Sequence, residues 1–188
     1  MNGRVTLNPL AHLDPIGTLA ILFLPIGWAK PVPINPGNFR NPQRDAILTS
    51  ALGPLSNICQ AFFWCLVLRG LIMILPGVIF SSTGEATLLG GFIAFMILIN
   101  VALAIFNLLP IGPLDGHHIM ENVLPYPYSR QYSEFNSRYG MFALLGFLLL
   151  ANLPGFNLLN YIIVIPAMLV GKLSGVNILR VISSAGIF

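Results

Sequence analysis

The chain is short of charge. Only 8% of its 188 residues are Asp, Glu, Lys or Arg, whereas 56% are hydrophobic. An ordinary soluble domain has roughly 25% charged residues, so this chain has too little polar surface to cover a globule in water. The nine basic and six acidic residues are scattered, which excludes the clustered Lys and Arg of a nucleic-acid-binding surface. The composition predicts a protein of the lipid bilayer that has no nucleic-acid partner.

Cysteine is equally scarce. Cys59 and Cys65 lie six residues apart in one apolar run, so on a helix their side chains point to different faces and cannot form a local disulfide. We expect two buried, inert thiols.

Four segments without Asp, Glu, Lys or Arg could enter a membrane: residues 15–29, 46–68, 86–114 and 139–171. A span needs about 20 apolar residues. The first segment is short and contains Pro25 and Gly27, so it is expected to dip into the membrane as a re-entrant piece. The last is interrupted at 152–157, which allows one tilted span plus an interfacial helix, or a hairpin.

The connections between these segments carry turn signals. Residues 30–36 include three prolines, which favour an extended loop. Residues 70–84 are uncharged, but Pro76, Gly77 and the Ser-Ser-Thr-Gly run at 81–84 predict a loop over the membrane surface. The predicted fold is all-α: a polytopic transmembrane helical bundle with re-entrant or extended proline-rich loops, in which residues 1–188 form one domain.

Basic residues predict the orientation. If the long segments each cross once, the 30–45 and 116–138 connections share a side of the membrane. Those two connections hold Lys30, Arg40, Arg44, Arg130 and Arg138, and the opposite 69–85 connection holds only Arg69. By the positive-inside rule, the end that carries Asp115 is cytoplasmic in a multi-pass cell-membrane protein.

Asp115 directly follows 29 uncharged residues, 86–114, so a carboxylate lies at the mouth of a membrane-length apolar stretch. An ionised Asp inside a membrane costs on the order of 2.5–3.5 kcal/mol, and such residues usually face a cavity, a partner charge or a metal. We therefore interpret Asp115 as a functional residue, and specifically as a metal ligand.

Asn107 precedes Asp115 by eight residues, with Pro110 and Pro113 between them. The prolines predict that the helix ends near Leu109 and gives way to an irregular segment, which a membrane tolerates only beside a cavity. Asn100 shares a helix face with Asn107 and would give that cavity a second amide. The alternative is that both amides only bond neighbouring helices.

Gly53 and Asn57 lie four residues apart, which puts a small residue and an amide on one helix face. This pattern permits close helix approach and an interhelical hydrogen bond. The pair either serves packing alone or lines the cavity near Asp115.

Four motifs in this order resemble bacterial members of the site-2 protease family of intramembrane zinc metalloproteases. They are Leu7-Asn-Pro-Leu-Ala-His-Leu-Asp-Pro15, Gly27-Trp-Ala-Lys-Pro-Val-Pro-Ile-Asn-Pro36, Gly53-Pro-Leu-Ser-Asn57 and Asn107-Leu-Leu-Pro-Ile-Gly-Pro-Leu-Asp-Gly116. The resemblance implies that Asp115 is one ligand of Zn²⁺ and that Asn107 binds substrate near the metal. It also implies an enzyme that hydrolyses peptide bonds of membrane-embedded protein substrates in the lipid bilayer. With it we place five residues in the substrate cavity: Gly53, Asn57, Asn100, Pro110 and Gly116.

The sequence departs from the family at one point. The resemblance implies a His-Glu-x-x-His helix that supplies two zinc ligands and the general base, and these 188 residues contain no such motif. We therefore expect an N-terminally truncated chain with an incomplete zinc site and no activity of its own. Two rivals stay open: a catalytically dead relative that binds transmembrane segments, and a small ion transporter. A self-contained site of Asp115, His117, His118 and His12 is disfavoured, because adjacent histidines diverge in most backbone conformations.

Overall fold

The computed structural model describes residues 13–15, 37, 39–151, 153 and 158–186. The chain divides into two compact units, Met1–Phe39 and Arg40–Phe188. Only residues 13–15, 37 and 39 of the first unit are described. His12, the proline-rich loop 30–36 and the predicted re-entrant segment 15–29, apart from Pro15, therefore lie outside the described residues.

The second unit is helical, which confirms the predicted all-α class. Its described residues contain no strand, and an isolated bridge pairs Phe80 with Ala86. The helices are α2 (Pro42–Ile74), α3 (Pro76–Ile79), α4 (Leu88–Leu108), α5 (Asp115–Val123), α6 (Tyr128–Ala151), α7 (Leu158–Leu173) and α8 (Ile178–Ser184).

Local capping explains where α2 and α4 begin. The Asn41 side chain accepts a hydrogen bond from the backbone N–H of Arg44 (3.2 Å), and Pro42 occupies the first turn of α2. Thr87 caps α4 in the same way through the N–H of Gly90 (3.2 Å). Helix α2 continues to Ile74 and α3 follows at Pro76–Ile79, so the predicted loop at 70–84 is wrong over most of residues 70–79. No proline or charged residue lies between Gly70 and Leu75, so α2 ends only just before Pro76.

Two helices are long and apolar enough to cross a membrane, α2 and α4. At 1.5 Å per residue, the 33 residues of α2 extend about 50 Å and the 21 residues of α4 about 32 Å, against a hydrocarbon core of about 30 Å. The predicted segment 139–171 is divided between α6, which ends at Ala151, and α7, which begins at Leu158. A polytopic arrangement stays a prediction.

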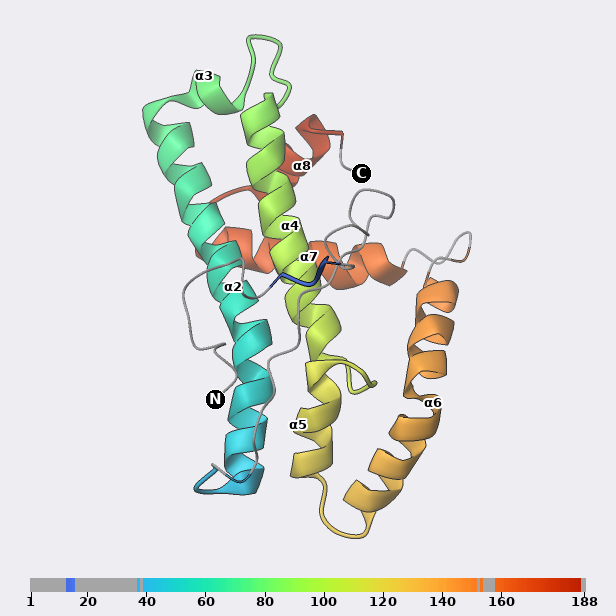
Figure 1. Cartoon of the computed structure of the whole chain (residues 1–188). Coiled ribbons are helices and arrows are strands. Elements are labelled where there is room, and N and C mark those ends of the chain that lie inside the picture. The colour runs from blue at the N-terminus through green and yellow to red at the C-terminus, as the bar shows by residue number, and fades with distance from the viewer. Residues whose placement is uncertain (1–12, 16–36, 38, 152, 154–157, 187–188) are drawn as a thin grey trace. The chain divides into compact units, whose positions relative to one another are not determined.

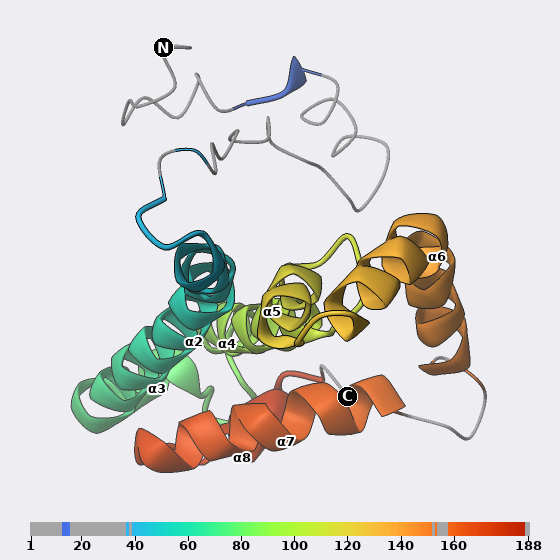
Figure 2. The ribbon, with the colours of Figure 1, turned by 90° about the horizontal axis from the view of Figure 1, so that it is seen from below.

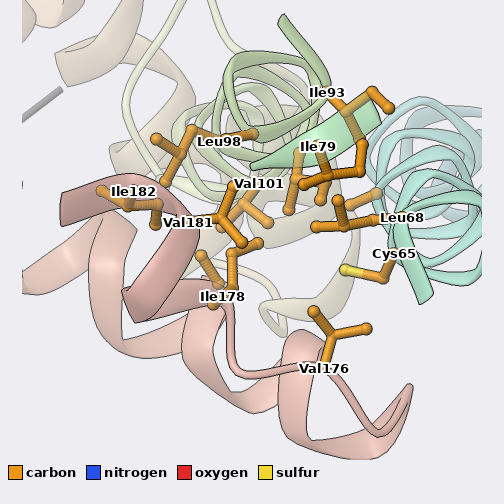
Figure 3. Close-up of a cluster of buried hydrophobic side chains, with 14 residues drawn as sticks. Cys65, Leu68, Ile79, Ile93, Leu98, Val101, Val176, Ile178, Val181 and Ile182 are labelled. Carbon is orange, nitrogen blue, oxygen red and sulfur yellow. The ribbon is translucent and has the colours of Figure 1, made fainter. Parts of the chain in front are cut away.

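Helices α2 and α4 lie side by side and antiparallel (Figures 1 and 2), and α5 continues beyond α4 along α2. Helix α6 packs beside α5, while α7 crosses the α2 and α4 pair, with α8 next to it. Figure 3 shows the apolar core where side chains of α2, α3, α4 and α8 meet, among them Leu68, Ile79, Ile93 and Ile178. On α2 this core involves the second half of the helix, away from Gly53. Cys65 is buried in the core, whereas Cys59 is exposed, so the prediction of two buried thiols is wrong for Cys59.

Candidate metal centre

The segment that joins α4 to α5 is irregular, as the prolines predict. Helix α4 ends at Leu108, the Gly112–Pro113 peptide bond is cis, and α5 begins at Asp115. Two side chains of α6 hold the segment in place. The Asn136 Oδ1 accepts a hydrogen bond from the Gly112 N–H (3.0 Å), and the Tyr132 hydroxyl donates one to the Pro110 carbonyl (2.7 Å). The polar backbone of this turn is therefore bonded by α6.

Asp115 lies at the first position of α5, and its partly buried carboxylate faces α2. A Cβ placed on Gly53 would lie 2.8 Å from the Asp115 Oδ2. The close approach of α2 to the carboxylate therefore requires a glycine at position 53. Burial raises the pKa of the Asp115 carboxyl above its usual value, and the nearby His118 opposes part of that rise. The structure thus brings together two of the predicted site residues, Gly53 and Asp115.

The contact between α2 and α5 extends to their ends. The Gln43 side-chain amide, at the start of α2, donates a hydrogen bond to the carbonyl of Asn122 near the end of α5. Residues 53 and 43 of α2 therefore meet residues 115 and 122 of α5, and the two helices are antiparallel. This second contact fixes the register in which Gly53 faces Asp115.

Gly116 is buried where α5 starts, and a Cβ there would collide with the backbone carbonyls of Leu108 and Leu109. Gly116 and Pro110 both line a small open pocket of about 230 Å³ together with Met120 and other apolar residues. The glycine permits α5 to begin directly against the end of α4, and this close approach sets the position of Asp115.

The predicted cavity amides lie in different environments. Asn100 is buried, and its Nδ2 donates to the Met96 carbonyl of its own helix (2.8 Å). Asn107 lies half-buried in the last turn of α4, and its side chain makes no hydrogen bond to the described residues. Asn57 is half-buried one turn beyond Gly53 on α2. No described contact joins these three amides to Asp115, and their roles stay predictions.

Helix α5 also holds a group of side chains that sequence reasoning overlooked in part. His117, His118 and Glu121 each offer a ligand atom, and these atoms all lie within 4.8 Å of one another. The two histidine rings tilt toward each other, with centroids 4.9 Å apart, instead of diverging as expected. The missing member was Glu121, whose spacing of four residues from His117 was a visible helical signal. Asn136 and Tyr132 gave no such signal, because their roles depend on contacts between distant segments.

Comparison with known proteins identifies the family. The model of the family described as "Peptidase family M50" matches residues 47–151, from the first turns of α2 to the end of α6. This chain belongs to peptidase family M50, the site-2 protease family. The match covers Gly53, Asn107 and Asp115, and it confirms the resemblance drawn from the four motifs.

A curated relative of this M50 chain is named "Putative zinc metalloprotease YwhC" and comes from Bacillus subtilis (strain 168). The two are 44% identical over 128 residues, which is 65% of this chain and 55% of the relative. The chain therefore spans little more than half the length of that relative. No solved structure matches it.

The described residues fit a zinc ion in part. Asp115 has features of a metal ligand: its partly buried carboxylate makes no hydrogen bond to the described residues and faces a glycine. A catalytic zinc takes three protein ligands and a water. Among the described residues, however, the group that brings three ligand atoms together does not include Asp115. The described residues of the M50 chain thus offer one candidate ligand at Asp115 and do not complete a zinc site around it.

Proposed function

We propose that this M50 chain contributes to an intramembrane zinc metalloprotease that hydrolyses peptide bonds of membrane-embedded proteins. In this proposal Asp115 supplies one zinc ligand, and a His-Glu-x-x-His segment outside these 188 residues supplies two more ligands and the general base. The observation that carries the proposal is the packing of Gly53 against the Asp115 carboxylate, inside the region that matches the family. A bound zinc would polarise the peptide carbonyl and activate a water.

The residues around Asp115 have separate tasks in this proposal. Gly53 leaves space beside the carboxylate, Gly116 sets the start of α5, and α6 holds the turn through Asn136. Asn107, in the last turn of α4, would hold the substrate peptide. The half-buried Asn57 and the pocket lined by Pro110 and Gly116 would form part of the substrate cavity.

We also propose that the Asp115 end faces the cytoplasm. The hydrogen bond from Gln43 to Asn122 puts the start of α2 and the end of α5 at the same end of the unit. Arg44 lies beside Gln43, and Arg130 follows soon after α5, while Arg69 lies near the other end of α2. This distribution is the one that the positive-inside rule associates with a cytoplasmic end.

The first test is to read the DNA upstream of codon 1, express the polypeptide that includes any His-Glu-x-x-His segment found there, and measure zinc content and cleavage of a membrane-embedded substrate. We expect Asp115→Asn to remove one equivalent of zinc and to lower kcat/KM by more than about 100-fold, since even outer-shell changes cost 10–100-fold. Glu134→Gln removes a surface carboxylate that pairs with Arg130 and should change neither quantity.

Three results would contradict the proposal in different ways. An Asp115→Asn enzyme that keeps its zinc and its activity would exclude Asp115 as a ligand. Proteolysis by the 188 residues alone would contradict the expected inactivity. Upstream DNA without the motif would favour the rival, a relative that binds transmembrane segments without cutting them.

A further inference from the structure

Three side chains of α5 that could bind a metal lie close together. The ligand atoms of His117, His118 and Glu121 lie within 4.8 Å of one another, and the His117 Nε2 is 3.7 Å from the Glu121 Oε2. Zinc bonds His and Glu at about 2.1 Å, which separates two ligands of a tetrahedral ion by roughly 3.4 Å. The cluster is therefore close to the spacing that one divalent ion requires, before any side chain moves.

His117 is fixed in the cluster by packing. Its ring contacts those of His118 and Tyr132, with centroid separations of 4.9 and 5.5 Å, and the Tyr132 hydroxyl is itself bonded to Pro110. The His117 Nδ1 is buried and has no hydrogen-bond partner among the described residues. Buried polar atoms are nearly always paired, so one nitrogen of the His117 ring lacks a protein partner while the other faces the Glu121 carboxylate.

The rest of the cluster is accessible. His118 is exposed, and the Glu121 side chain is 33% exposed, so an ion can reach the group from solvent without opening the helix packing. Two imidazoles and one carboxylate form a donor set that suits zinc, cobalt or nickel, whereas magnesium and calcium prefer oxygen ligands alone. Among the described residues, this is the group that brings three such atoms together.

We infer that His117, His118 and Glu121 form an accessory site for a divalent transition-metal ion, distinct from the metal centre at Asp115. Asp115 is outside the group, and its carboxylate faces Gly53 of α2, whereas the three ligands all belong to the first two turns of α5. An ion there would link residues one, three and four positions apart and so stabilise the start of the helix that carries Asp115. The site goes beyond the proposed protease function and does not depend on it.

The experiment titrates the purified, metal-free chain in detergent with Co²⁺ and follows the visible absorption bands of the bound ion, then displaces it with Zn²⁺. We expect saturable binding that Mg²⁺ does not compete with. His118→Ala and Glu121→Gln should each weaken Co²⁺ binding by more than about tenfold, since each removes one of three ligands. Glu134→Gln, which removes an exposed carboxylate on α6, is the matched control and should bind like the parent.

Asp115→Asn separates this site from the proposed catalytic one. It should leave the Co²⁺ site of the chain intact, and an equal loss of binding in Asp115→Asn and Glu121→Gln would overturn the inference, because both would then belong to one site. Absence of Co²⁺ bands in the folded parent would also overturn it and leave the His117 and Glu121 contact as an ordinary helical ion pair. Circular dichroism of each variant without metal tests whether it is folded. We expect native spectra, because His118 is exposed and Glu121 is partly exposed.

Discussion

The two ends of the Arg40–Phe188 unit are held together by different forces. At the Arg69 end, α2, α3, α4 and α8 bury a continuous apolar core (Figure 3) whose members include Leu68, Ile79 and Ile178. At the Asp115 end, specific polar contacts join neighbouring segments: Asn136 with Gly112, Tyr132 with Pro110, and Gln43 with Asn122. One end resists unfolding through many interchangeable contacts, and the other sets the position of a carboxylate through contacts that have no substitute.

This difference separates stability from geometry. Apolar burial contributes in proportion to area, so the core can lose a contact and keep its shape. A hydrogen bond or a glycine contact acts at one position, so its loss moves one segment. We therefore expect changes in the core to lower the free energy of unfolding, and changes near Asp115 to affect metal binding and activity out of proportion to stability.

The largest loss of stability should follow Leu68→Ala. Leu68 is 0% exposed, in the centre of the core, and Leu→Ala changes at such positions cost about 2–5 kcal/mol because they leave a cavity. Leu66→Ala is the matched control on the same helix, because Leu66 is 45% exposed. Unfolding in mixed detergent and SDS micelles measures both variants, and equal losses would show that burial within the unit does not determine the stability of α2.

Gly116→Ala should lower the free energy of unfolding by a smaller amount, about 1–3 kcal/mol. A Cβ at this position overlaps the backbone carbonyls of Leu108 and Leu109 and forces the start of α5 to move. The same substitution at Gly146, where a Cβ meets nothing within 4 Å, should be neutral or slightly stabilising. The change at Gly116 should also weaken zinc binding in the complete enzyme. Unchanged zinc affinity would mean that α5 can shift without moving Asp115.

Much of the fold followed from the sequence because the signals were local. Charge-free runs predicted α2 and α4, and Pro110 and Pro113 predicted the irregular turn before Asp115. The break at 152–157 likewise separated α6 from α7. The end of α2 was predicted too early, because the turn residues that indicated the loop, Pro76 and Gly77, follow Ile74 and do not act on the residues before it.

The candidate site was predictable in its residues and not in its contacts. Asp115 and Gly53 were singled out separately, and their meeting depends on the antiparallel register of α2 and α5, which no spacing in the sequence reveals. Asn136 was missed because it bonds Gly112 across 24 residues. The His117 ring lies close to those of His118 and of Tyr132 on α6, and reasoning on two adjacent residues alone did not predict this arrangement.

Gly53→Ala should have the smallest effect on stability, and it should separate the stability of the unit from the geometry at Asp115. The Cβ would lie 2.8 Å from the Asp115 Oδ2, so the carboxylate has to turn away, while α2 gains up to about 1 kcal/mol from replacing glycine within a helix. Gly70→Ala gives the same helical gain on α2 with nothing within 4 Å. We expect the free energies of unfolding of the two variants to agree within about 1 kcal/mol.

In the complete enzyme, Gly53→Ala alone should lower kcat/KM, by about tenfold to 100-fold, because a misplaced ligand disturbs the reacting geometry. Equal activity in the two variants would show that the space beside Asp115 serves helix packing and not the metal.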